Sequence, residues 1–330
     1  MKKKTLVGIK ISSSYQLINF LALYDEVRFI YEKAIVYKYN YWGDDKIYKR
    51  YLDFAEKMGV EVKEATREKD IVNDLNVEGK SVFFNREFDF VYVNNISIVI
   101  KLSFPYSKSF IISDGLGMYG DIFTYIGAYK REKKVNDYSL CVFFAGINFL
   151  LKKMAGYLFK SSSFSLFDPL TLKINKRYIE SIKKIFNESL SSLPKLKNGT
   201  MIFISQPLVQ LGIISHGEYS SIINRLKKIA NDEGLDFLIK LHPVELSGNE
   251  YISSDFFQFD GLIEEACVID KNVKVVVSFL STGSLNIEFL SDAKNYILPV
   301  SILNLRLSKK QKILISMIKE IDIGNEYKII

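Results

Sequence analysis

The sequence has few of the residues that form cross-links and bind metals. Among its 330 residues are two cysteines and two histidines. Two cysteines cannot build a disulfide scaffold, and both Cys141 and Cys267 lie in apolar runs, so we expect buried free thiols and a reducing compartment. The two histidines, His216 and His242, are too few for a multi-histidine metal site and limit any mechanism that depends on an imidazole.

The sequence also lacks a long hydrophobic run and a signal peptide. Its longest apolar stretch, residues 140–151, is shorter than the roughly 20 residues that a membrane-spanning helix needs. The basic N-terminus is interrupted by Lys10 and a serine cluster before a signal-peptide core can form. We therefore expect a cytoplasmic protein, either unattached or held peripherally on the inner face of the cytoplasmic membrane.

Positive charge is in excess, because 45 Lys and Arg face 38 Asp and Glu and give a net charge of +7. This excess favours anionic partners, which include nucleotides, nucleic acids and membrane surfaces. No motif with interleaved basic and aromatic residues is visible, so we expect no nucleic-acid partner. The basic segments 130–134 and 305–312, with the apolar stretch 140–159, leave peripheral membrane binding open, and that stretch would equally suit a homodimer interface.

Alternating apolar and polar segments predict two α/β domains. A length of 330 residues is typical of about two domains. A break that contains Pro and Gly, residues 193–200, divides the chain into an N-terminal domain, residues 1–192, and a C-terminal domain, residues 193–330. In both halves short apolar strands alternate with helical segments, which predicts parallel sheets and a ligand cleft between the halves.

Local patterns predict individual elements. Residues 6–11 and 27–38 predict strands on either side of a helix that begins at a serine cluster. Residues 88–93 and 96–102 predict two further strands, joined as a hairpin across the intervening asparagines. The C-terminal half predicts strands at 201–205, 237–241, 273–278 and 295–298 and helices at 218–232, 262–267 and 284–290.

A histidine closes one of these strands. Lys240, His242 and Pro243 follow an apolar run, and Pro243 biases the preceding backbone to an extended conformation that directs the imidazole outward. A histidine at a strand end is suited to protonate a leaving group, because its ordinary pKa of about 6.5 lies close to working pH. The alternative is a histidine in an ordinary surface turn.

Hydroxyl side chains follow another strand. Ser278, Ser281 and Thr282 lie between an apolar strand and a helix, and the unpaired amides at a helix N-terminus favour an anion such as phosphate. Simple N-capping is the alternative interpretation. The segment is not a P-loop, because it lacks the lysine of that motif.

Three carboxylates complete the candidates. Asp114 follows a short strand and stands beside Gly115, where it could accept a proton from an acceptor hydroxyl, although Asp-Gly is also a frequent turn dipeptide. Glu264 and Glu265 could hold ribose hydroxyls, or could be exposed helical glutamates. No Asp-x-Asp sequence stands at a suitable strand end, which is consistent with chemistry that requires neither a metal nor another cofactor.

Taken in order, these segments resemble those of the bacterial sialyltransferases, in particular glycosyltransferase family fifty-two and the related bacterial polysialyltransferases. The segments are the N-terminal Ser-x-x-Gln stretch with Ser14 and Gln16, an acidic-acidic-Gly motif at 113–115, a Ser-Gln-Pro-Leu strand end with Gln206, the His-Pro pair, and the Ser-Thr pair at 281–282. The resemblance implies a GT-B fold, in which two Rossmann-like domains face a cleft.

The resemblance further implies an inverting, metal-independent transfer of sialic acid from CMP-sialic acid to a sugar hydroxyl of lipooligosaccharide or capsule. Asp114 would be the general base, and His242 the general acid or the donor to the phosphate. The implied CMP-binding residues are Lys240, Pro243, Glu264, Glu265, Ser281 and Thr282, with Ser14, Gln16, Gly115, Gln206 and Ser278 in support.

The sequence departs from the family pattern at two motifs. Ser113 stands at the first acidic position, so the base would be lost if that position rather than Asp114 supplied it. Val244 and Glu245 follow the His-Pro pair where we expect a basic residue, which leaves open another CMP-activated nonulosonic acid as donor. Two other functions remain open: a GT-B transferase that uses a different nucleotide sugar, and a non-catalytic protein that binds nucleic acid or membranes.

Overall fold

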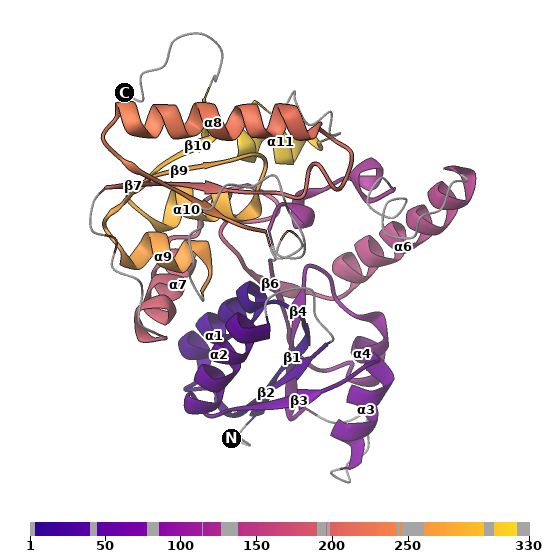
Figure 1. The fold of residues 1–330 in the computed structure, drawn as a ribbon. Helices are drawn as coiled ribbons and strands as arrows, with labels where there is room; N and C mark the ends of the chain where they lie inside the picture. The colour runs from indigo at the N-terminus through magenta and orange to yellow at the C-terminus, as the bar shows by residue number, and fades with distance from the viewer. Residues whose placement is uncertain are drawn as a thin grey trace. The chain divides into compact units, whose positions relative to one another are not determined.

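The computed structural model describes residues 4–39, 45–77, 86–113, 115–126, 138–189, 196, 199–242, 245, 261–299 and 307–321. The chain divides into two compact units, Met1–Ile185 and Phe186–Ile330, and each unit contains one parallel sheet with helices between its strands (Figure 1). The predicted α/β class is therefore confirmed. The domain boundary predicted between residues 192 and 193 stays a prediction, because the residues on either side of it lie outside the described ranges.

The first unit is built on a parallel sheet with the strand order β3-β2-β1-β4-β5-β6. The chain winds outward from β1 to β3 and then returns to β4, so the direction of winding switches between β1 and β4. In open sheets of this kind, ligands bind beyond the carboxyl ends of the strands at such a switch. The strands are β1 (Lys4–Ile11), β2 (Tyr31–Lys38), β3 (Val60–Glu64), β4 (Phe88–Val93), β5 (Ser109–Ile112) and β6 (Ser161–Phe164).

Helices cover both faces of the first sheet, with α1 and α2 on one side and α3 and α4 on the other (Figure 1). Phe90 of β4 packs in one apolar cluster with Ile71 of α3 and Ile100 of α4. On the opposite face a Cβ at Gly8 would lie 2.9 Å from Cδ2 of Phe20, so only glycine lets α1 approach β1 this closely. The helices are α1 (Ser14–Val27), α2 (Asp45–Lys57), α3 (Glu68–Val77), α4 (Ile98–Ser103), α6 (Tyr138–Leu158) and α7 (Lys176–Glu188).

The serine cluster after β1 starts α1, as predicted. The hydroxyl of Ser13 accepts a hydrogen bond from the N–H of Gln16 at 3.1 Å, which satisfies one of the amides that have no partner within the helix. The hydroxyls of Tyr15 and Tyr178 lie 2.8 Å apart and join α1 to α7. The predicted strand at 27–38 starts later, at Tyr31, because α1 continues to Val27.

The strand predicted at 96–102, and the hairpin with it, is wrong. This segment forms α4, whose N-cap Ser97 accepts a hydrogen bond from the N–H of Ile100 at 3.2 Å. β4 and β5 pair in parallel, and a parallel pair requires a crossover connection, which α4 supplies. The alternation of apolar residues in this short segment is compatible with either structure, so the pairing of the neighbouring strands decides between them.

α6 exposes an apolar surface. None of the described helices is long and apolar enough to cross a membrane. Exposed apolar side chains recur every three or four residues along α6 and therefore lie on one side of it. The peripheral membrane association and the homodimer that the sequence leaves open both stay predictions. The residues with this spacing are Leu140, Phe143, Phe144, Ile147, Leu150, Leu151, Met154 and Leu158, and Val142 is exposed as well.

The second unit contains a parallel sheet with the strand order β11-β10-β9-β7-β8. α8 packs on one face, where Tyr219 joins a cluster with Phe203, and α9 and α10 pack on the other, where Ala266 and Ile287 meet Ile202. The strands and helices predicted for this half are confirmed, with bounds shifted by one or two residues. They are β7 (Thr200–Ile204), α8 (His216–Asp232), β8 (Asp236–Lys240), α9 (Ile263–Ile269), β9 (Val273–Ser278), α10 (Thr282–Leu290) and β10 (Lys294–Ile297), followed by α11 (Lys309–Ile315) and β11 (Lys319–Glu320).

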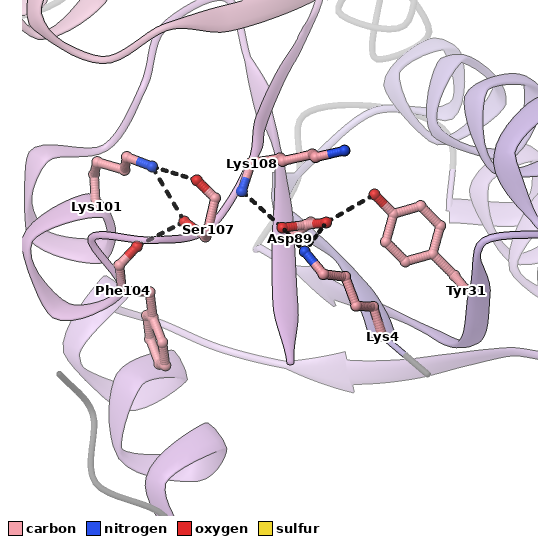
Figure 2. A network of polar contacts seen from close by, with 7 residues as sticks. All are labelled: Lys4, Tyr31, Asp89, Lys101, Phe104, Ser107 and Lys108. Carbon is pink, nitrogen blue, oxygen red and sulfur yellow. Dashed lines mark hydrogen bonds and ion pairs between the residues drawn. The ribbon is translucent and has the colours of Figure 1, made fainter. Parts of the chain in front are cut away.

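A buried carboxylate joins the strands of the first sheet. Asp89 of β4 accepts from the ammonium of Lys4 on β1 at 3.0 and 3.1 Å and from the hydroxyl of Tyr31 on β2 at 3.0 Å (Figure 2). It also accepts from the backbone N–H of Lys108, just before β5, at 2.7 Å. Because the carboxylate is buried, these donors replace the water that it loses on folding. One side chain therefore ties together three strands and the start of a fourth.

We expect Asp89→Ala to lower the free energy of unfolding by about 3–5 kcal/mol, because it leaves the ammonium of Lys4 and the hydroxyl of Tyr31 without their shared acceptor. Urea denaturation followed by circular dichroism measures the change. The matched control is Glu64→Ala, which removes the exposed partner of Lys38 on the same sheet and should change the stability little. Equal effects of the two substitutions would contradict the role of Asp89.

Candidate functional site

The carboxyl ends of β7, β8 and β9 bring together the residues predicted for the second unit. Ile204 of β7 is the register partner of both Lys240 on β8 and Ser278 on β9. The loops that follow these three residues therefore begin at the same edge of the sheet. The direction of winding also switches here, because the chain leaves β7 for β8 on one side and returns to β9 on the other. This edge is the expected position of a ligand.

A buried carboxylate holds the turn that carries His242. The backbone N–H of His242 donates to Oε2 of Glu245 at 3.0 Å and to the hydroxyl oxygen of Ser205 at 3.0 Å. That hydroxyl in turn donates to Oε2 of Glu245. The N–H of Glu245 closes the turn by donating to the carbonyl of His242 at 2.8 Å. The ends of β7 and β8 are thus joined through Glu245.

Burial changes the acid–base properties of this turn. It lowers the pKa of the His242 imidazole below its ordinary value of 6.5, because the charged form loses solvation. It raises the pKa of the Glu245 carboxyl, although the Ser205 hydroxyl and the His242 N–H act in the opposite direction. His242 is half-buried, and its catalytic role stays a prediction.

Glu245 is the residue that sequence reasoning missed as part of the site. The only signal was its position, three residues after His242, where we expected a basic residue. Its partner Ser205 lies 40 residues earlier in the chain. Burial of this carboxylate follows from the pairing of β7 with β8, which no local pattern reveals.

A second contact joins β7 to the loop between β9 and α10. The side-chain amide of Gln206 donates to the carbonyl of Leu280 at 2.6 Å. Ser281 is the N-cap of α10, and its hydroxyl accepts from the N–H of Gly283 at 3.2 Å. The capping interpretation of Ser281 is thus confirmed, which leaves open whether the hydroxyl also binds an anion. Ser278 is buried, and its hydroxyl donates to the carbonyl of Phe279 at 2.7 Å.

The two glutamates of α9 have different surroundings, and neither is exposed. Oε1 of Glu264 accepts from the amide of Asn286 on α10 at 3.1 Å and would lie 3.4 Å from a Cβ at Gly283. Burial raises the pKa of Glu264, and the positive charge of Lys240 opposes that shift. Oε1 of Glu265 instead accepts from the hydroxyl of Ser189, beyond the end of α7, at 3.2 Å. Glu264 therefore contacts the first turns of α10.

In the first unit the predicted residues lie near the carboxyl ends of β1 and β5. Ser14 and Gln16 are buried in the first turn of α1, and Oε1 of Gln16 accepts from the N–H of Ser12 at 2.8 Å. Gly115 follows β5 with φ 126°, a conformation that glycine adopts readily and other residues rarely do. The hydroxyl of Ser113 accepts from the N–H of Gly115 at 3.0 Å, which shapes this turn.

Two predicted site residues, Asp114 and Pro243, lie outside the described residues. Thr282 is the first residue of α10 and Lys240 the last residue of β8, so both stand at the edge where the loops begin. Within the described ranges, no three His, Cys, Asp or Glu side chains are grouped so that they could hold a metal ion. The Cys267 thiol is unbonded and buried, as predicted.

A family model matches a part of the chain that includes this edge. Residues 61–298 match the family model described as alpha-2,8-polysialyltransferase. This span contains β7, β8 and β9 and the loops that follow them, together with β4 and β5 of the first unit. No curated protein sequence matches the chain.

Solved structures with low sequence identity are similar to this chain. A protein assigned as a UDP-N-acetylglucosamine 2-epimerase from Listeria monocytogenes is 9% identical, with 96% of this chain and 83% of that chain covered and a TM-score of 0.53. A UDP-glucosyltransferase from Polygonum tinctorium is 8% identical, with 96% and 83% covered and a TM-score of 0.51. A sialyltransferase from Photobacterium damselae is 14% identical, with 95% and 96% covered and a TM-score of 0.42. With the two parallel sheets, the predicted α/β class of GT-B type is confirmed.

We expect Glu245→Ala to lower the free energy of unfolding by about 1–3 kcal/mol, because the Ser205 hydroxyl and the His242 N–H lose a charged acceptor in a buried place. The imidazole signal of His242 should shift in the proton NMR spectrum, since the turn that carries it is released. The matched control is Asp232→Ala, an exposed carboxylate at the end of α8 in the same unit. If the His242 signal shifts in neither Glu245→Ala nor the control, Glu245 does not position the turn.

Proposed function

The chain belongs to the alpha-2,8-polysialyltransferase family and is a glycosyltransferase, and we propose that it transfers sialic acid from CMP-sialic acid to a sugar hydroxyl of a bacterial surface glycan. The main support for this proposal is the common edge formed by the carboxyl ends of β7, β8 and β9. Gln206, His242 and Ser281 lie in the loops that follow these three adjacent strands. Donors at such an edge suit the phosphate of a nucleotide.

The phosphate of CMP would bind between the turn of His242 and the start of α10. In this proposal the imidazole N–H and the hydroxyls of Ser281 and Thr282 donate to phosphate oxygens, with the N-terminal amides of α10 behind them. CMP leaves as a phosphate monoester, so these donors offset the negative charge that develops as it departs. They would take the role that a divalent metal has in other transferases, which makes the proposed transfer metal-independent.

Contacts within the second unit favour one glutamate for the cytidine. Glu264 lies beside Gly283 and Asn286 of α10, next to the loop that would hold the phosphate. Glu265 is held by Ser189 at the end of α7. We therefore assign Glu264, with Lys240 nearby, to the hydroxyls and base of the cytidine, and assign Glu265 to holding Ser189.

The first unit would supply the base. Asp114 follows β5 in the sequence and precedes Gly115, whose φ of 126° is open to glycine and rare for other residues. The acceptor oxygen forms a bond to the anomeric carbon of sialic acid and its proton passes to Asp114. The bond from that carbon to the phosphate oxygen breaks, and CMP leaves with the bonding electrons. Attack from the side opposite the phosphate inverts the configuration. The acceptor we propose is a glycan of lipooligosaccharide or capsule, reached from the cytoplasm.

We expect Asp114→Ala and His242→Ala each to reduce transfer from CMP-sialic acid by a factor of about 10² or more, because each removes a group that moves or donates a proton in the reaction. Release of CMP in the presence of a glycan acceptor measures the rate, and thermal melting checks that each variant is folded. Asp232→Ala serves again as the control that removes an exposed charge. Full activity in either of the first two variants would remove that residue from the proposed mechanism.

We expect CMP, but not UDP or GDP, to raise the melting temperature and also to raise the pKa of His242 from its lowered value, because a bound phosphate favours the imidazolium. Thermal shift and proton NMR titration measure the two effects. A His216→Gln variant assigns the imidazole signals, since the chain has two histidines. Stabilisation by UDP or GDP alone would indicate a different nucleotide sugar. CMP binding without a change at His242 would place the phosphate elsewhere.

A further inference from the structure

A polar pocket lies in the first unit at the opposite end of β5 from Asp114. The pocket has a volume of about 430 Å³ and is formed by Lys101 of α4, the residues that open β5 and β6, and the end of α6. Because β5 runs from Ser109 to Ile112, the pocket opens at the amino ends of the strands, whereas Asp114 follows the carboxyl end. The proposed function uses none of the residues that line it.

The lining of this pocket is basic and rich in hydroxyls. Three lysines line it, and so do serines at the starts of both strands. None of the described residues that line it is acidic. Such a lining presents hydrogen-bond donors and positive charge, which suits an oxyanion rather than a neutral ligand. The lysines are Lys101, Lys108 and Lys160, and the serines are Ser107, Ser109, Ser161 and Ser162.

Lys101 is a buried cation whose described acceptors are neutral. Its side chain is 5% exposed, and its ammonium donates to the carbonyl of Ser107 and, at 3.4 Å, to the hydroxyl of the same residue (Figure 2). It also lies 5.8 Å from the centre of the Phe159 ring. Dipoles and a ring compensate a buried charge less well than a carboxylate does, so an anion in the adjacent pocket would stabilise Lys101.

The buried carboxylate of Asp89, whose charge acts on Lys101, is already occupied. Asp89 is bound by the ammonium of Lys4, the hydroxyl of Tyr31 and the backbone N–H of Lys108 (Figure 2). Figure 2 also shows the Lys108 side chain directed away from Lys101, so we assign the anion contact to Lys101 and to Lys160, which immediately precedes β6.

We propose that this pocket binds an oxyanion carried on a small organic group, at a site separate from the nucleotide site. A volume of about 430 Å³ lies within the range of small-molecule sites and admits a group the size of one monosaccharide. Two sources share this chemistry: the carboxylate of an acidic sugar residue and the phosphate of a phosphorylated group. The lysines and serines would donate to either.

Isothermal titration of the full chain with three probes tests the proposal. The probes are inorganic phosphate, a short oligomer of sialic acid, and lactose as a neutral sugar. We expect at least one anionic probe to bind and lactose not to bind. Lys101→Met and Lys160→Gln should each weaken that binding about tenfold, since each removes one charged donor. Lys69→Gln, which removes an exposed charge on α3, should leave the binding unchanged.

The variants separate the outcomes. Lys160 is exposed, so its substitution is expected to fold even if loss of the buried Lys101 ammonium disturbs the unit, and thermal melting checks both. Binding of phosphate alone identifies a phosphorylated ligand, and binding of the oligomer alone identifies an acidic glycan. The proposal is overturned if the anions bind equally well to wild type, Lys101→Met and Lys160→Gln. It is also overturned if neither anion binds.

Discussion

β7 pairs in parallel with β8 on one side and with β9 on the other, and the position of every candidate side chain in the second unit depends on this pairing. All three strands run in the same direction, so their carboxyl ends form one edge. The strands themselves are apolar and buried on both faces, as Ile202 and Phe203 show by packing in different clusters. A shift of one residue would exchange those faces, so the core fixes the register and the register places the site.

Buried carboxylates have different hydrogen-bond donors in the two units. In the first unit Asp89 is compensated by an ammonium, a phenol and a backbone amide, so its function is to join strands. In the second unit the described donors to Glu245 and Glu264 are a hydroxyl, an amide and backbone N–H groups, and burial raises the pKa of both carboxyls. Carboxylates that retain such a cost in the folded state are typical of binding and catalytic sites. The contrast supports a nucleotide site at the edge of the second sheet.

Local sequence patterns predict the elements that their own residues stabilise. The strands at Phe88–Val93 and Val273–Ser278 match their predictions, because each is a short apolar run that a sheet buries. The motif-bearing loops are also predictable, since His242 and Ser281 directly follow such runs. The segment 96–102 was wrongly predicted because seven residues rich in apolar side chains suit a helix or a strand, and only the parallel pairing of β4 with β5 decides. Glu245 and Glu264 were not recognisable as buried, because their partners come from other elements.

The side chains of His242, Glu245 and Glu264 determine how the edge of the second sheet responds to acid. The ordinary pKa is 4.5 for a glutamate carboxyl and 6.5 for an imidazole. Between these two pH values, acidification relieves the free-energy cost of burying the Glu245 and Glu264 carboxylates, because their pKa is raised in the folded state. Over the same range it weakens the fold at His242, whose folded pKa is lowered. The two effects on stability oppose each other, whereas their effects on charge add, because each proton gained makes the edge more positive. Mild acid would therefore strengthen the attraction of this edge for an anion over the same pH range in which its two effects on stability oppose each other.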